Sequence, residues 1–134
     1  MKKWMALSGF LCFSFCGYSV FSQKSSQSVI PKKMELKQYF FVMLTKGPSR
    51  DQDSAAAAKI QEGHMNNIRR LADHGKILVA GPFGDDGDWL GIFIFDCKTK
   101  EEVISYLKTD PAISAGRLNY DVRPWWTAKN CVFK

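Results

Sequence analysis

Apolar positions recur with helical spacing between residues 53 and 75, DSAAAAKIQEGHMNNIRRLADHG. At about 100° per residue, one apolar stripe falls within an arc of roughly 80°. The stripe consists of Ala57, Ile60, His64, Ile68 and Leu71. Charged and amide side chains occupy the opposite face, as is typical of the solvated side of an amphipathic helix. The pattern predicts one helix over 53–75, with Asp53 or Ser54 capping its start and Gly75 closing its end.

A histidine, His64, stands at the centre of this apolar stripe. One interpretation is a structural histidine, because a buried imidazole needs only one hydrogen-bond partner. The other is an acid/base group directed into a pocket between helix and sheet, since imidazole exchanges protons near neutral pH. The pattern of positions leaves both roles open.

Apolar runs of strand length flank this helix and a second one. The runs are residues 38–45, 76–83, 89–97 and about 118–123. Thr99 and Glu102 form a capping box that starts a second helix, expected to end near Asp110. A loop of small residues should follow at 112–116, and Pro124 should end the last strand. The order β-α-β-β-α-β predicts an α+β, ferredoxin-like fold with a four-stranded antiparallel sheet.

Two of the expected strands are apolar on both faces, at residues 39–44 and 90–95. A sheet with one solvated face would alternate between apolar and polar side chains, so the second face also needs cover. The chain is too short to supply another layer, and we therefore expect a homodimer that pairs sheet to sheet. The buried contacts should include Phe40, Val42, Ile92 or Ile94, with the strand register deciding which set faces the partner.

The first 22 residues follow a different pattern. Lys2 and Lys3 precede an apolar run that ends before Ser22. Residues 1–22 therefore have the pattern of a signal peptide that is cut between Ser22 and Gln23, which predicts a periplasmic or secreted protein without a membrane attachment after cleavage.

Two alternatives to a cleaved signal peptide are a retained membrane anchor and a lipoprotein signal at Cys16. Residues 23–37 are polar and rich in serine, so we expect a flexible linker between the leader and the folded domain. The domain itself is expected over residues 38–130.

Composition excludes several classes of function. An apolar fraction of 46% supports a packed core, and the formal net charge of +6 is scattered rather than gathered into a basic stripe, so nucleic acid is not expected as a partner. Cys97 and Cys131 form no metal-ligand cluster, and whether they pair is left open by their spacing. No glycine-rich phosphate loop and no nucleophile motif is present. We therefore expect no metal and no cofactor.

Taken together, the motifs resemble those of the YciI-like (YCII-related) domain family, a ferredoxin-like fold that pairs as a dimeric α+β barrel. The resemblance covers residues 39–126. It rests on His64, LVAGPF at 78–83, GDWLGIFIF at 87–95, EEVISYLKTDPAISAG at 101–116 and VRPWW at 122–126.

The resemblance implies that His64 and Asp110 form a catalytic dyad in a pocket, and that the backbone around Gly81 and Pro82 binds the substrate at its rim. For Asp110 alone, capping of the turn after it is the structural alternative. Reactions known in similar proteins, elimination of HCl from a chlorinated hydroxyquinol and isomerisation of muconolactones, imply a cofactor-free lyase or isomerase. Its substrate would be a small cyclic or aromatic-derived molecule. The alternative is a non-catalytic dimeric module that binds a small ligand or a partner protein. The secretory leader departs from the family pattern, so a cytoplasmic catabolic role is not carried over.

Overall fold

The computed structural model describes residues 35–129. The elements are β1 (Leu36–Lys46), α1 (Ser54–Asp73), β2 (Ile77–Pro82), β3 (Trp89–Phe95), α2 (Lys100–Leu107), α3 (Pro111–Ser114) and β4 (Leu118–Ala128). The expected signal peptide and Cys131 lie outside the described residues. The signal peptide stays a prediction, which the N-terminal sequence of the mature protein decides. Among the described helices, none is long and apolar enough to cross a membrane.

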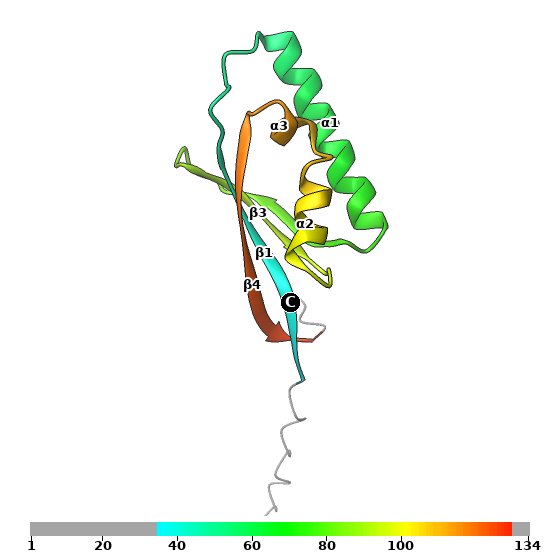
Figure 1. The fold of residues 1–134 in the computed structure, drawn as a ribbon. Coiled ribbons are helices and arrows are strands. Elements are labelled where there is room, and N and C mark those ends of the chain that lie inside the picture. Colours follow the sequence, from blue (N-terminus) through cyan, green and yellow to red (C-terminus); the bar gives the residue numbers. More distant parts are fainter. Residues whose placement is uncertain (1–34, 130–134) are drawn as a thin grey trace, which may run out of the picture. The chain divides into compact units, whose positions relative to one another are not determined.

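The strands form one antiparallel sheet in the order β2-β3-β1-β4. This is the ferredoxin-like arrangement, so the α+β fold expected from the sequence is confirmed. The helices α1, α2 and α3 all cover the same face of the sheet (Figure 1). The core lies between these two layers, where Phe95 and Val103 are fully buried.

The register shows which strand residues face the helices. Phe40, Val42 and Leu44 of β1 belong to the core beneath the helices. Side chains alternate across a strand, so Phe41 and Met43 lie on the opposite, helix-free face, and so do the β3 residues paired with them, Ile94 and Ile92. Phe40 and Val42 therefore do not face a partner. Of the expected set, Ile92 and Ile94 lie on the helix-free face, and Ile92 is the more exposed of the two because Ile94 is only 7% exposed within the single chain.

A homodimer joined through this helix-free face stays a prediction. Light scattering at micromolar concentration should give the mass of two chains. Replacing Ile92 by aspartate should convert the particle to a monomer, because a charge would be buried in the joined faces. A wild-type protein that scatters as a soluble monomer would contradict the homodimer.

The ends of α1 are formed as the sequence pattern indicates. The Asp53 carboxylate accepts a hydrogen bond of 2.8 Å from the amide of Ala56, and Gly75 adopts φ = 65°, which suits glycine at a helix end. The buried positions of α1 are His64, Asn67 and Leu71. His64 and Leu71 belong to the predicted stripe, whereas Asn67 does not.

β4 is longer than the sequence pattern suggested. It runs to Ala128 and passes through Pro124, which pairs with Phe40 of β1. The expectation that Pro124 ends the strand was wrong because β4 lies at the edge of the sheet. An edge strand is paired on one side only, so a proline there need not remove a hydrogen bond from the ladder.

The segment expected to be a loop at 112–116 contains a short helix, α3. Asp110 caps it by accepting hydrogen bonds from the amides of Ala112, at 2.8 Å, and Ile113, at 3.4 Å. Pro111 occupies the first turn, where its fixed φ favours a helix and its missing N–H costs nothing. The turn after α3 closes at Gly116 with φ = 70°.

Candidate functional site

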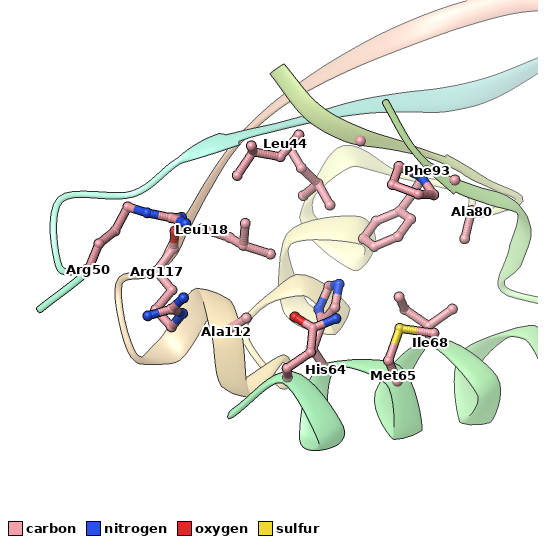
Figure 2. Close-up of a pocket in the computed structure, with 15 residues that line it drawn as sticks. Leu44, Arg50, His64, Met65, Ile68, Ala80, Phe93, Ala112, Arg117 and Leu118 are labelled. Carbon is pink, nitrogen blue, oxygen red and sulfur yellow. Dashed lines mark hydrogen bonds between the residues drawn. The ribbon is translucent and has the colours of Figure 1, made fainter. Parts of the chain in front are cut away.

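A cavity of about 390 Å³ lies between α1 and the sheet. His64, Met65 and Ile68 line it from α1, and Leu44 and Phe93 line it from the central strands (Figure 2). Gly81 and Pro82 of β2 also belong to its wall, and their expected role in binding a substrate stays a prediction. The volume lies within the range of small-molecule sites. Its lining is mostly apolar with a few polar side chains, which is the usual composition of such a pocket.

His64 and Asp110 are brought together although they lie 46 positions apart in the sequence. The Nδ1 atom of His64 lies 3.0 Å from Oδ1 and 2.8 Å from Oδ2 of Asp110. Asp110 is only 1% exposed and is not part of the cavity wall. The expectation that both residues line the pocket was therefore wrong for Asp110, which lies behind the imidazole ring. The structure fixes this geometry, and the catalytic role of the pair stays a prediction.

The protonation of the pair follows from the surroundings of Asp110. Burial alone would raise the pKa of this carboxyl group. The hydrogen bond and positive charge of His64, the amide of Asn67 and the Ala112 N–H outweigh burial and hold the pKa of Asp110 below its ordinary value of 3.8. Asp110 is thus a carboxylate at neutral pH and can only accept hydrogen bonds. It follows that Nδ1 of His64 carries a hydrogen and donates it.

The other ring nitrogen of His64 is open to the cavity. Nε2 makes no hydrogen bond with any residue in the range 35–129. Every buried side-chain nitrogen or oxygen atom in that range has a hydrogen-bond partner. Because Nε2 has none, it is not buried, and it is accessible from the cavity that His64 lines. With Nδ1 protonated, Nε2 of the neutral ring carries the lone pair. The site therefore presents a basic nitrogen to whatever occupies the cavity.

A second layer of side chains fixes the carboxylate. Asn67 donates a hydrogen bond of 3.2 Å from Nδ2 to Asp110. Its Oδ1 accepts a hydrogen bond of 2.7 Å from Arg70. The Thr109 hydroxyl also lies 3.1 Å from this oxygen, but its one hydrogen has a shorter contact, of 2.7 Å, with the main-chain carbonyl of Tyr106. The hydrogen bond from Arg70 opposes rotation of the Asn67 amide, so its NH₂ group stays directed at Asp110. The arrangement resembles the outer-shell support that orients functional histidines in other sites.

Sequence reasoning missed Asn67, and it also missed two arginines of the cavity wall, Arg50 and Arg117. A signal for Asn67 was present, because it follows His64 by three positions and shares its helix face. Arg50 and Arg117 lie in loops that meet only in the folded chain, so no spacing pattern identified them.

Other chemistry finds little support in the described part of the chain. Residues 35–129 contain no group of three or more histidine, cysteine, aspartate or glutamate side chains placed to hold a metal ion. Cys97 forms no disulfide with another residue of this range, and burial raises the pKa of its thiol to about 11. Cys97 is therefore protonated at neutral pH and is a poor nucleophile.

A family model for the YCII-related domain matches residues 39–126, which include β1, the cavity and both members of the His64–Asp110 pair. The chain belongs to the YCII-related domain family. The family resemblance seen in the sequence motifs is thereby confirmed.

Two solved structures are similar to this YCII-related domain. Muconolactone isomerase aligns with a TM-score of 0.56 and 17% sequence identity, over 72% of this chain and 96% of that chain. The 5-chloro-2-hydroxyhydroquinone dehydrochlorinase of Burkholderia phenoliruptrix, solved in complex with 2,5-dihydroxybenzoquinone, aligns with a TM-score of 0.47 and 25% identity, over 65% of this chain and 92% of that chain. The likeness to muconolactone isomerase shows that the two chains share a fold. No protein with a curated description matches the chain.

Proposed function

We propose that this YCII-related domain is a cofactor-free enzyme, an isomerase or lyase, that uses His64 as a general base on a small cyclic or aromatic-derived molecule. One observation supports the proposal above all others. His64 donates from Nδ1 to a buried carboxylate while Nε2 is open to a cavity of about 390 Å³. This combination gives the ring one tautomer, one orientation and access to a ligand.

In the proposed reaction Nε2 of His64 removes a proton from a carbon atom of the bound molecule. The electron pair of the broken C–H bond moves into a new double bond. In an isomerisation, an adjacent double bond of the molecule shifts in turn, and its electron pair takes the proton back from the imidazolium at another carbon. In an elimination, a leaving group departs with its bonding electrons instead. Asp110 stabilises the imidazolium that forms in either case, because its negative charge lies against Nδ1.

Hydrogen exchange with solvent provides a test that does not require the natural substrate to be known. We would incubate the protein in D₂O with a panel of single-ring acids, lactones and phenols and follow deuterium incorporation by proton NMR. Wild-type protein should catalyse exchange at one carbon position of at least one compound. His64→Gln should slow that exchange by about 100-fold or more, which is the usual contribution of a general base. His74→Gln is the matched control, because His74 is exposed and its ring bonds to the main-chain carbonyl of Arg70 on the same helix.

Two outcomes would contradict the proposed chemistry. Exchange that continues at the wild-type rate in His64→Gln would exclude His64 as the base. Compounds that bind and raise the melting temperature without any exchange would instead favour the non-catalytic binding module. Thermal melts of both histidine variants show whether each is folded, so that a loss of exchange is not mistaken for unfolding.

A further inference from the structure

Two arginines lie together at one end of the cavity (Figure 2). Arg50 comes from the loop between β1 and α1, and Arg117 comes from the turn between α3 and β4. Arg50 donates a hydrogen bond of 3.0 Å to the main-chain carbonyl of Arg117. Arg117 donates one of 2.6 Å to the side-chain carbonyl of Gln52. Main-chain hydrogen bonds between the two loops, including one of 2.9 Å from Gly47 to Arg117, hold the arginines in place.

No carboxylate among the described residues is paired with these two arginines. Both acceptors are neutral carbonyl groups, and neither arginine forms a salt bridge within residues 35–129. No aspartate or glutamate is among the described residues that line the cavity. The carboxylate of Asp110 lies behind the ring of His64 and already accepts four hydrogen-bond donors. The arginine end of the cavity therefore has excess positive charge and unused N–H donors.

Guanidinium groups with free donors match the planar geometry of a carboxylate, which accepts two parallel hydrogen bonds from one arginine. The attraction between an arginine and a carboxylate is stronger in a partly enclosed site than in open water, because protein screens the charges less than water does. We propose that Arg50 and Arg117 form an anion subsite, and that the ligand of this cavity is a single-ring carboxylic acid bound as its carboxylate. This inference rests on the proposed function in taking the cavity as the substrate site.

The apolar part of the wall agrees with such a ligand. Leu44 and Leu118 lie between the arginine end and the rest of the cavity in Figure 2, and Phe93 stands over His64 with a ring-centroid separation of 6.2 Å. A ring held by its carboxylate at Arg50 and Arg117 would pack on these apolar side chains. The subsite would then orient the ring relative to Nε2 of His64, which is the positioning that a proton transfer from carbon requires.

Benzoate and benzamide are suitable probes, because they have nearly the same shape and differ in charge. Isothermal titration should show wild-type protein binding benzoate at least about tenfold more tightly than benzamide. Arg50→Gln and Arg117→Gln should each weaken benzoate binding by about tenfold and leave benzamide binding unchanged. Arg69→Gln is the matched control, because Arg69 is exposed and its guanidinium donates to Asn66 on the same helix. It should leave the affinity for both probes unchanged.

Equal affinity for the two probes, or absence of benzoate binding, would overturn the anion subsite. A loss of benzoate affinity in Arg69→Gln as large as that in Arg50→Gln would also overturn the subsite, because it would show that only the net charge of the protein matters. Should Arg117→Gln fail to fold in a thermal melt, the Arg50→Gln result decides. His64→Gln separates this inference from the proposed chemistry, because it should keep the preference for benzoate while losing proton exchange. If exchange is never observed but the preference still depends on Arg50 and Arg117, the proposed reaction fails and the subsite stands.

Discussion

Replacing Asp110 by alanine should lower the free energy of unfolding at neutral pH by about 3 kcal/mol or more. The Asp110 side chain is almost fully buried and accepts hydrogen bonds from His64, from Asn67 and from the amide of Ala112. Without the Asp110 carboxylate these donors have no acceptor, in a part of the protein that water does not readily reach. The helix α3 also loses its N-cap. Chemical denaturation of wild-type and variant proteins measures the difference.

The pH dependence of stability should change in the same variant. The pKa of Asp110 is lowered in the folded protein, so at a pH between its folded and unfolded pKa values the unfolded chain binds more protons than the folded chain. The stabilisation from Asp110 is therefore complete above its ordinary pKa of 3.8 and is lost as the pH falls through its folded pKa. As the pH falls through the folded pKa of Asp110, wild type should lose the stabilisation that the ionised side chain provides, which Asp110→Ala does not have to lose.

Asp85→Ala is the control for both measurements, because Asp85 is an exposed carboxylate in the turn between β2 and β3. It should alter the free energy of unfolding by less than about 0.5 kcal/mol and leave its pH dependence as in wild type. If Asp110→Ala behaved like Asp85→Ala, the buried network around Asp110 would not have the strength that its geometry implies.

Replacing Asp110 by asparagine should remove activity while retaining most of the fold. One side-chain oxygen remains, and the Ala112 amide, which lies 2.8 Å from Oδ1, is expected to keep it as its acceptor. The new NH₂ group would then face Nδ1 of His64. NH₂ can only donate, and at the Oδ2 position it lies closer to Nδ1, at 2.8 Å, than the remaining oxygen does, at 3.0 Å. We therefore expect Nδ1 to accept from it and the proton of the neutral ring to move to Nε2. A protonated Nε2 cannot act as a base toward the cavity.

For Asp110→Asn we therefore expect proton exchange to fall by about 100-fold or more, as for loss of the base itself. The NMR exchange assay measures this, and a thermal melt confirms that the variant is folded. Thr109→Ser is a suitable control, because it keeps the hydroxyl group next to Asp110 and should retain near-wild-type exchange. Exchange at the wild-type rate in Asp110→Asn would show that the tautomer of His64 does not control the reaction.

Local patterns were sufficient to predict the order of the four strands and the two longer helices. The spacing of Ile68 and Leu71 around His64, and the cap at Asp53, are short-range features that a helix enforces by itself. The extent of β4 was not predictable in this way. Pro124 is tolerated because of its position at the edge of the sheet, and that position depends on how four distant segments pair.

The candidate site was predictable to the extent that one helix carries it. His64 stood out because a polar group interrupted an apolar stripe. Its partner Asp110 came from the family resemblance, since neither helix spacing nor strand alternation relates two positions so far apart. Arg50 and Arg117 approach each other only through the contact between two loops, whose geometry has no periodicity to detect. Long-range contacts of this kind are specified by the whole fold.

The protonation state of the His64 ring tests the central claim most directly. In protein labelled with ¹⁵N in the histidine rings, two-bond proton–nitrogen correlation spectra identify which nitrogen carries the hydrogen in the neutral form. His74→Gln removes the only other histidine and leaves one set of signals. We predict that Nδ1 of His64 is protonated and Nε2 is not, and that Asp110→Asn reverses this assignment. A wild-type ring with its hydrogen on Nε2, or one unchanged by Asp110→Asn, would contradict the account.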